Sequence, residues 1–364
     1  MKTINISIQH ISKKYSVFIG EKLIATLSNL ISLNSYSQAY VITDSTVAPH
    51  YLEPVTKALQ ESFSNEKIHS YIFDAGEKSK QLSTVENIYQ NMAEKNLDRK
   101  SVVINLGGGV VTDLGGFAAS TYLRGLPFIN ISTTLEGMVD ASVGGKTGAN
   151  LGTMKNYVGT FSQPKAVITD VSTLHTLPHR TLIQGYAEVL KHGLIADKKY
   201  FEEVSEKPFS EFNSKKQIDI IARSVEIKVD IVRQDEYESS TRKLLNFGHT
   251  IGHVLESLSF SSSNPLYHGE AVAIGMVAEA KIAALSGMIS DTDFNKIASA
   301  IQIVGLPIKY TAKTSVDEIY SLLSTDKKNS GGKIKWTLLS AIGAGEENVE
   351  IGESFVRKAI AYIL

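Results

Sequence analysis

Short hydrophobic runs alternate with stretches of helical periodicity over the first half of the chain. The pattern predicts strands over residues 39–43, 68–73, 101–106, 128–132 and 166–169, with helices over 47–62, 82–95 and 114–122. Residues 4–9 and 15–19 alternate in the manner of a hairpin. Because strands that alternate with helices form a parallel sheet covered on both faces, this half is predicted to be α/β, with ligands at the carboxyl ends of its strands.

In the second half of the chain, the apolar residues recur with the period of a helix rather than in short strand-like runs. Apolar side chains recur at helical spacing over 218–232, 271–285 and 293–304, and one short strand is predicted over 335–339. The change of pattern falls near residues 170–178. We therefore expect a Rossmann-like parallel-sheet domain over residues 1–172 and a mainly α-helical domain over residues 173–364.

Composition narrows the class of protein. The 364 residues are 43% hydrophobic and 21% charged with a net charge of −1, which is typical of a soluble globular protein and gives no global field for nucleic acid or membranes. There is no cysteine, so thiolate ligands are excluded and any metal must be bound by His, Asp or Glu. The start of the sequence lacks an apolar signal-like region and no apolar run is long enough to span a bilayer, so we expect a cytoplasmic protein.

A first glycine-rich segment is a candidate for anion binding. Gly107-Gly108-Gly109 follows a predicted strand and precedes a predicted helix, so its backbone can approach a pyrophosphate at a helix N-terminus. It is not the dinucleotide fingerprint G-x-G-x-x-G, because Thr112 stands at the last glycine position. A plain tight turn is the alternative interpretation, and the nearby Asp113 favours a ligand contact.

A second glycine-rich segment, Ser142–Gly148, carries Lys146. It superficially resembles a Walker A motif, but Asp140 stands where that motif needs its first glycine. Lys146, Lys155 and Asn156 instead offer two cations and an amide to a small phosphorylated or carboxylated substrate. The alternative interpretation is a solvated loop.

Histidines and a glutamate suggest a metal site in the helical half. His249 and His253 are four residues apart and fall on one face of a predicted helix, and His268 follows. Glu188 lies in a helical pattern upstream, and one glutamate with two histidines makes a catalytic zinc set with an open fourth position. The alternatives are a core histidine plus a capping one, and a surface ion pair between Glu188 and Lys191.

Other polar residues have simpler interpretations. Asp235, Glu236 and Glu238 form an acidic cluster that is either a solvated helix end or a support for Arg242. Six histidines have no such context and are interpreted as ordinary: His10, His50, His69, His175, His179 and His192.

Taken together, these segments resemble the 3-dehydroquinate synthase family of sugar phosphate cyclases. The matching blocks are Gly76–Lys80, Gly107–Leu114, Ser132–Leu135, Val139–Gly148, Gly185–Gly193, Leu244–Glu256, His268–Met276 and Asp326–Lys328. The resemblance implies NAD bound across the N-terminal domain and a divalent metal, Zn²⁺ or Co²⁺, held by the helical domain.

The resemblance also implies roles for single residues. The family's metal ligands correspond to Glu188, His249 and His268 of this chain. His253 is then expected beside the substrate as a hydrogen-bonding or acid–base group. The implied NAD contacts are Asp44, Glu77, Lys80, Gly108, Gly109, Val110, Asp113, Thr133, Thr134, Lys146, Lys155, Thr173, Leu174, His175 and Thr176. The implied substrate contacts are Asp140, Lys146, Asn156, Lys191, Lys228, Arg242, Asn246 and His253, with Arg124 and Lys328 as further candidates.

The implied reaction is an NAD-dependent cyclisation. The substrate would be 3-deoxy-D-arabino-heptulosonate 7-phosphate, which is transiently oxidised, loses phosphate, is reduced again and closes by an intramolecular aldol step to 3-dehydroquinate, in the shikimate pathway of aromatic amino acid biosynthesis. Lys146, Lys191, Lys228 and Arg242 suit a substrate with both a phosphate and a carboxylate. The resemblance further implies a homodimer whose partners are small molecules, with neither nucleic acid nor membrane, and with Arg124 reaching the neighbouring subunit's site.

Three alternatives stay open at this point: a sister cyclase for another sugar phosphate, a metal-dependent polyol dehydrogenase of the same architecture, and a non-enzymatic binding protein. A dehydrogenase would be expected to have aspartate where Glu188 stands. The chain departs from the family pattern at Thr181, His192, Ser240-Thr241 and Glu136-Gly137-Met138, but no departure removes a ligand or a cation.

Overall fold

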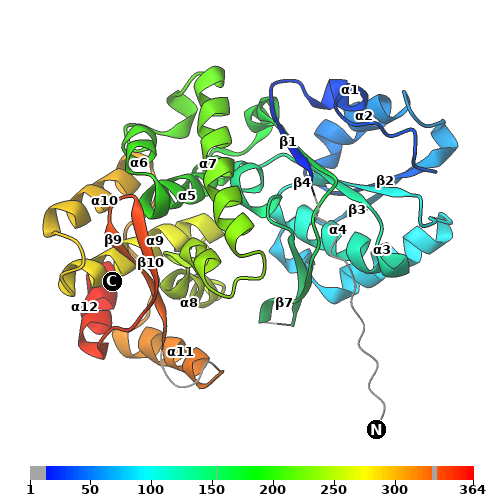
Figure 1. The fold of residues 1–364 in the computed structure, drawn as a ribbon. Helices are drawn as coiled ribbons and strands as arrows, with labels where there is room; N and C mark the ends of the chain where they lie inside the picture. The colour runs from blue at the N-terminus through cyan, green and yellow to red at the C-terminus, as the bar shows by residue number, and fades with distance from the viewer. Residues whose placement is uncertain (1–13, 153, 330–333) are drawn as a thin grey trace, which may run out of the picture.

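A computed structural model describes residues 14–152, 154–329 and 334–364, without the side chains of 324–329. Its first half contains a parallel sheet with strand order β1-β8-β5-β4-β2-β3 (Figure 1). The strands are β1 (Ser16–Gly20), β2 (Ala39–Asp44), β3 (Ile68–Phe73), β4 (Val102–Gly107), β5 (Phe128–Ser132) and β8 (Ala166–Asp170).

Helices cover both faces of this sheet, because successive strand residues point to opposite sides. In β2, Val41 packs with α2 on one face, while Tyr40 and Ile42 pack with α3 and α4 on the other. The helical segments of this half are η1 (Ile24–Thr26), α1 (Leu27–Leu30), α2 (Ala48–Leu59), η2 (Asn65–Lys67), η3 (Glu77–Ser79), α3 (Leu82–Glu94), α4 (Gly109–Thr121), η4 (Tyr122–Arg124), η5 (Gly137–Ala141) and η6 (Val171–Thr176).

The predicted strands and helices of the sheet are confirmed, with two differences. Helix α4 begins at Gly109 rather than at Leu114, because the glycine turn passes directly into the helix. Strand β1 pairs in parallel with β8, and its expected hairpin partner, residues 4–9, lies outside the described residues.

An antiparallel hairpin follows η5 and was not predicted from the sequence. It consists of β6 (Lys146–Leu151) and β7 (Met154–Phe161), and it projects from the sheet domain (Figure 1). A solvated loop was one interpretation of Ser142–Gly148, and no strand was predicted over residues 154–161. Strand β7 buries no side chain fully, so it lacks the apolar run of a core strand. The hairpin carries Lys146, Lys155 and Asn156.

The second half is mainly helical, as expected, and its apolar core extends to Leu135, Val139 and Val167 of the sheet half. Its elements are α5 (His179–Ala196), α6 (Lys198–Val204), η7 (Phe209–Glu211), α7 (Ser214–Gln234), η8 (Thr241–Asn246), α8 (His249–Ser259), α9 (His268–Leu285), α10 (Asp291–Ile303), α11 (Val316–Asn329), β9 (Trp336–Ala341), β10 (Ala344–Val349) and α12 (Glu353–Ile363). The strand predicted over 335–339 is β9, which pairs with β10 in an antiparallel ribbon.

Helices α8 and α9 lie against each other because glycines face the contact. A Cβ on Gly275 would come within 1.9 Å of the Gly248 carbonyl oxygen, and one on Gly252 would lie 3.0 Å from that of Ala271. Only glycine at position 275 therefore permits this approach. The close packing brings the histidines of the two helices together.

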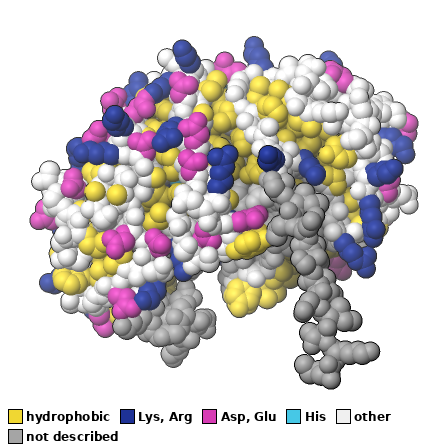
Figure 2. All heavy atoms as spheres, in the orientation of Figure 1, with side chains coloured by type: hydrophobic (Ala, Val, Ile, Leu, Met, Phe, Trp, Pro, Cys, Tyr) yellow, Lys and Arg dark blue, Asp and Glu magenta, His cyan; other side chains and the backbone are white. Residues whose placement is uncertain are grey.

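The two halves lie side by side in Figure 1. The last strand of the sheet ends at Asp170 and the first long helix begins at His179, so the division at 172/173 stays a prediction about independent domains. In the face seen in Figure 2, acidic and basic side chains are mixed over the helical half. Among the described residues, no helix is both long and apolar enough to cross a membrane.

Candidate active site

A groove of about 1270 Å³ lies between the sheet half and the helical half. Its walls come from the carboxyl ends of the parallel strands, from the β6–β7 hairpin and from α5, α7, α8 and α9. Most of the residues predicted from the sequence line it: Asp44, Glu77, Lys80, Gly108, Gly109, Val110, Asp113, Thr133, Thr134, Asp140, Lys146, Lys155, Asn156, Thr176, Lys191, Lys228, Arg242, Asn246, His249, His253 and His268.

The glycine turn presents the N-terminus of α4 to this groove. Gly108 is the N-cap of the helix, and no side chain caps the first turn. A Cβ on Gly108 would lie 2.8 Å from the Thr134 side chain, so a larger residue would push the turn away from β5. The exposed N–H groups and the positive end of the helix dipole make this turn suitable for a pyrophosphate.

Buried polar pairs surround this turn. Lys80 Nζ lies 2.5 Å from Asp113 Oδ2, and the lysine is only 5% exposed. Burial alone would lower the pKa of Lys80, but the carboxylates of Asp113 and Glu77 raise it. Asn150 Nδ2 donates to Glu77 Oε1 over 2.8 Å, and Asp44 Oδ1 accepts the N–H groups of the turn that follows β2. These predicted NAD residues therefore already have protein partners.

Five predicted positions do not line the groove: Thr173, Leu174, His175, Arg124 and Glu188, of which Glu188 is described below. In η6, Thr173 and Leu174 are buried and His175 is exposed, whereas Thr176 lines the groove and lies 2.6 Å from the Tyr51 hydroxyl. Arg124 is exposed outside the groove with a φ of 71°. Lys328 belongs to α11, in the stretch whose side chains lie outside the described part.

Glu188 is a deeply buried carboxylate on α5. It is 1% exposed, and Lys191, one turn along the helix and also 1% exposed, forms an ion pair with its Oε2. Its Oε1 has no hydrogen-bond donor among the described residues and lies 3.7 Å from His249 Nε2. Burial raises the pKa of Glu188 although Lys191 lowers it. The pair is therefore not the surface ion pair that the sequence left open.

Three histidines converge beside Glu188. One ring nitrogen each of His249, His253 and His268 lies within 4.8 Å of the others. His249 Nδ1 lies 3.2 Å from the Phe247 carbonyl, and His268 Nδ1 lies 3.4 Å from Glu256 Oε2. When Nδ1 donates to such an acceptor, Nε2 keeps its lone pair for a metal. His253 makes no hydrogen bond to any described residue.

These contacts fit a divalent metal. The unpartnered Oε1 of Glu188 and the Nε2 atoms of His249 and His268 are a nitrogen–oxygen donor set of the kind that binds Zn²⁺ or Co²⁺. The grouping by distance favours the three histidines together, so the choice between Glu188 and His253 as the third ligand stays a prediction.

The charges around the three rings differ. Burial, with Lys191 next in importance, holds the pKa of His249 well below its usual range, and burial lowers the pKa of His253 to about 4. Burial also acts to lower the pKa of His268, but its hydrogen bond to Glu256 and the charges of Glu136, Glu256 and Glu188 raise it to about 9. The field at the His268 ring is thus negative and favours a cation.

A pair formed by the half-buried Asp140 and the buried Lys228 adjoins the metal residues. Asp140 lies in η5, a single turn of π-helix, and Lys228 Nζ lies 2.6 Å from both its Oδ1 and its carbonyl oxygen. Burial acts to raise the pKa of Asp140, but Lys228 and Lys191 hold it well below its usual range. His192 Nε2 lies 3.9 Å from Asp140 Oδ1.

Arg242 is fixed by backbone carbonyls. Its Nη atoms donate to the carbonyl oxygens of Gly144, at 3.0 Å, and of Glu236, while its Nε has no partner among the described residues. Asp235 accepts N–H groups from Ser240 and Arg242, which shapes the turn. The acidic cluster therefore supports the arginine, partly through a main-chain carbonyl rather than through its carboxylates.

Sequence reasoning missed three residues. Glu238 lines the groove, has a φ of 62°, pairs with Lys146 and accepts a hydrogen bond from Asn246; no sequence signal indicates that turn. Glu256 also lines the groove, and its place one turn beyond His253 on α8 could have indicated it. His192, interpreted as ordinary, lies fully buried beside Asp140, where its Nδ1 is 2.6 Å from Ser224 Oγ and burial lowers its pKa to about 3.

The fold is similar to solved sugar phosphate cyclases. A 2-deoxy-scyllo-inosose synthase complexed with carbaglucose-6-phosphate, NAD⁺ and Co²⁺ superposes with a TM-score of 0.86 at 26% identity over 96% of each chain. A 2-epi-5-epi-valiolone synthase from Streptomyces hygroscopicus subsp. jinggangensis 5008, with NAD⁺ and Zn²⁺ bound, gives 0.87 at 26% identity over 99% of each chain. A butanol dehydrogenase from Thermotoga maritima, at 14% identity and a TM-score of 0.69, shares the fold alone.

Fold and groove thus define an enzyme of the sugar phosphate cyclase class. Sequence models of the N-terminal and C-terminal parts of 3-dehydroquinate synthase match residues 70–184 and 185–329. The chain is 41% identical over 335 residues to the 3-dehydroquinate synthase of Alkaliphilus metalliredigens (strain QYMF), with 92% of each chain covered. It is 42% identical over 336 residues to that of Campylobacter jejuni subsp. jejuni serotype O:23/36 (strain 81-176), covering 91% of this chain and 92% of the other. The chain belongs to the 3-dehydroquinate synthase family.

Proposed function

We propose that this protein converts 3-deoxy-D-arabino-heptulosonate 7-phosphate into 3-dehydroquinate and phosphate, as a carbon–oxygen lyase of the shikimate pathway that depends on NAD and a divalent metal. The observation that carries the proposal is the groove, where a glycine turn, a histidine cluster and several cationic side chains face one cavity. Relatives that are about 40% identical over most of their length are 3-dehydroquinate synthases, which supports this substrate over that of a sister cyclase.

Glu188, His249 and His268 would hold the metal, which as a Lewis acid polarises hydroxyl groups of a bound substrate. The chain's own contribution is to keep these donors in place. Lys191 fixes one oxygen of Glu188 and leaves the other toward His249. His253 lies beside them without a competing hydrogen bond from the described residues, so its ring is available to accept or donate a proton at a substrate hydroxyl.

The sheet half would hold NAD, which supplies a reversible hydride acceptor when bound. The N-terminus of α4 is expected to bind the pyrophosphate at Gly108, Gly109 and Val110. Asp44 and Glu77 also line the groove and are expected to contact the adenosine part. The fit rests on the glycine turn, which has no side chain to fill the space in front of the helix.

Cationic side chains on both walls suit an anionic substrate. Arg242, Lys228 and Lys191 project from the helical half, and Lys146 projects from the hairpin. Such groups bind a phosphate at one end of a small molecule and a carboxylate at the other. Asp140 and Asn246 add hydrogen-bonding groups for hydroxyls. We assign no protein base to the elimination, since the leaving phosphate can remove the proton itself.

One assay tests the proposal. Phosphate release and 3-dehydroquinate formation should follow addition of the heptulosonate phosphate, trace NAD and Zn²⁺, and NADH should not accumulate because the hydride returns to the substrate. Growth of NADH in proportion to product would favour the dehydrogenase alternative. Turnover of another sugar phosphate, with none of the heptulosonate phosphate, would favour a sister cyclase.

We further propose a cytoplasmic homodimer that closes about residues 170–178 when substrate bridges its two halves. Arg124 supports the dimer, because it is exposed outside its own groove and would be free to reach a neighbour's site. Closure would exclude water from the reacting groups. Full activity of a monomer at nanomolar concentration would count against the dimer, and solution scattering without compaction on binding a substrate analogue would count against closure.

A further inference from the structure

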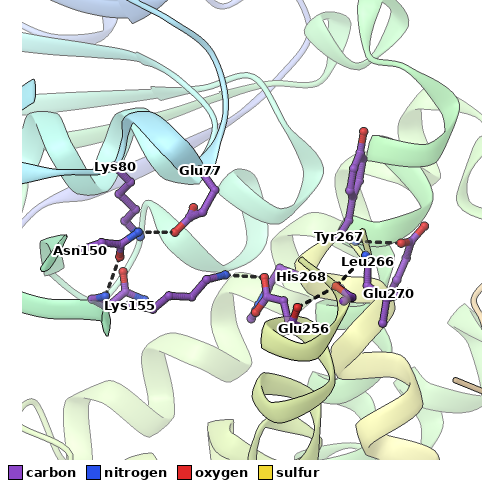
Figure 3. Close-up of polar contacts among 12 residues, drawn as sticks. Glu77, Lys80, Asn150, Lys155, Glu256, Leu266, Tyr267, His268 and Glu270 are labelled. Atoms are coloured by element: carbon purple, nitrogen blue, oxygen red, sulfur yellow. Dashed lines mark hydrogen bonds and ion pairs between the residues drawn. The ribbon is translucent and has the colours of Figure 1, made fainter. Parts of the chain in front are cut away.

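We infer that Glu256 is a positioning residue of the metal site: its carboxylate orients the ring of His268 and is itself fixed across the groove by Lys155. The inference rests on the metal ligands proposed above. Glu256 belongs to α8, His268 begins α9, and Lys155 comes from β7 of the sheet half, so the three side chains join three separate elements. Figure 3 shows Glu256 between the other two.

The geometry gives each oxygen of Glu256 its own partner. Oε1 lies 2.6 Å from Lys155 Nζ, and Oε2 lies 3.4 Å from His268 Nδ1. The carboxylate is only 5% exposed, so water does not screen these contacts strongly. With Nδ1 directed at a carboxylate, His268 carries its proton there and turns Nε2 toward the neighbouring histidines and Glu188.

Electrostatics supports the same arrangement. Lys155 Nζ at 2.6 Å and His268 Nδ1 at 3.4 Å each face one oxygen of Glu256, and both favour the charged form of this carboxylate. An anion behind the imidazole makes Nε2 a better donor to a metal than a neutral acceptor would.

His249 provides an internal contrast. Its Nδ1 faces the carbonyl oxygen of Phe247, a neutral acceptor two residues earlier in the chain. The orientation of His249 thus depends on the turn that precedes α8, whereas that of His268 depends on a carboxylate held from the other half of the molecule. Lys155 also lies 4.9 Å from the ring centre of Phe260, which gives its aliphatic stem and charge a second contact on the helical half.

Lys155 consequently has a partner that the sequence did not reveal. Its predicted contact was NAD, but its ammonium group is engaged by Glu256. The pair bridges the groove from the hairpin to α8. Movement of the hairpin would therefore change the charge behind His268, and so the strength with which this side of the site holds a metal.

The test measures Co²⁺ binding to the full-length protein without substrate or NAD, by calorimetric titration and by the visible spectrum of the bound ion. Glu256→Gln keeps the size of the side chain and removes its charge. We expect Co²⁺ affinity to fall about 10- to 100-fold, the usual effect of removing a group that orients a metal ligand, with a shifted visible spectrum. Glu346→Gln, an exposed glutamate of β10, is the matched control and should bind as the native protein does.

Lys155→Met is the second variant, and it should weaken Co²⁺ binding less than Glu256→Gln does. The double variant should be no worse than Glu256→Gln alone, because both changes act through one carboxylate. Native Co²⁺ affinity and spectrum in Glu256→Gln would overturn the inference. If that variant fails to fold, native affinity in Lys155→Met would overturn it instead.

Glu188→Gln separates this inference from the proposed function. It should abolish tight Co²⁺ binding in any case. If Glu188→Gln binds Co²⁺ like the native protein, the proposed ligand set itself fails. If only Glu256→Gln does so, the ligand set stands and the positioning role of Glu256 is wrong.

Discussion

Each side of the groove has a buried lysine paired with a carboxylate, and the two pairs differ in which polar atoms are left without a hydrogen bond. On the sheet side, Lys80 and Asp113 lie 2.5 Å apart in a direct hydrogen bond. On the helical side, Lys191 pairs with one oxygen of Glu188, while the other has no hydrogen-bond donor among the described residues. Because buried polar atoms are nearly always paired, the first pair is complete within the protein, whereas Glu188 Oε1 is available as a donor atom for a metal.

The comparison shows how a structural ion pair differs from one that can bind a metal in the same groove. Both pairs bury charge, so burial alone does not separate them. The difference lies in the unused atoms, since Glu188 Oε1 faces His249 at 3.7 Å and can accept a shared cation. We therefore expect substitutions of the sheet-side pair to affect stability and substitutions of the helical-side pair to affect metal binding.

Glu188→Gln should have the largest effect. Loss of the anionic ligand should remove the metal and lower activity on the order of 10³-fold or more, since Lewis-acid stabilisation contributes several kcal/mol. Metal analysis and phosphate release measure the two effects. Asp113→Asn is the control and should keep its metal. Metal loss in both variants would contradict the view that only the pair on the helical side binds the metal.

Arg242→Lys should lower kcat/KM about 10²-fold while the metal content stays normal. A lysine ammonium cannot hold the Gly144 and Glu236 carbonyls and also offer a planar fork to a carboxylate. Steady-state kinetics with the heptulosonate phosphate gives the ratio. An unchanged kcat/KM would remove Arg242 from substrate recognition and reopen the question of which sugar phosphate is used.

Asp113→Asn should act mainly on stability and on NAD binding. It leaves Lys80 buried without its anion, which we expect to reduce the free energy of unfolding by about 2–3 kcal/mol, less than for a fully buried pair because the Asp113 side chain is 20% exposed. Denaturant unfolding measures the loss. The double variant Lys80→Met/Asp113→Leu should recover part of it, and a double variant less stable than Asp113→Asn would contradict the account.

The smallest expected effect concerns a third buried carboxyl group, Glu279, which accepts N–H groups of Gly248 and Ile251 at the start of α8. Burial raises the pKa of Glu279 from 4.5 to about 8, despite those hydrogen bonds. The folded state then keeps a proton that the unfolded chain has released, so this group's contribution to stability falls as the pH rises from 4.5 to 8.

Glu279→Gln should remove that pH dependence. The melting temperature of the native protein should fall between pH 5 and pH 8 by roughly a few °C more than that of the variant. Thermal melting at a series of pH values in one ionic strength provides the measurement. Parallel curves for the two proteins would show that Glu279 does not titrate in this window.

The sequence predicted the sheet well because its central strands β4, β5 and β8 are fully buried. Residues such as Ile104 and Ile131 belong to apolar runs that only a covered parallel strand tolerates. The β6–β7 hairpin escaped prediction because its buried strand, β6, is built of small and polar residues such as Thr147, Gly148 and Asn150, and β7 is largely exposed. Neither strand therefore has the apolar pattern by which a strand is predicted.

The candidate site was predictable where residues cluster in sequence. His249 and His253 share a helical turn, so their proximity follows from geometry. Glu238 was missed as a site residue, because a left-handed turn places it beside Lys146, which is far away in the sequence. The isolation of Glu188 Oε1 is likewise a property of packing, and no sequence spacing reports which polar atom lacks a partner.

The π-helical turn Gly137–Ala141 makes the site unusually sensitive to a change in chain length. The Ser142 N–H donates to the Gly137 carbonyl over 3.2 Å, so this turn contains one residue more than an α-helical turn would. Deleting one residue between Gly137 and Asp140 would turn the residues that follow it in this helical turn by about 100° about the helix axis. Asp140 would then leave Lys228 even though no residue had been substituted. Natural variation in this segment should therefore consist of substitutions, and one-residue deletions should be selected against.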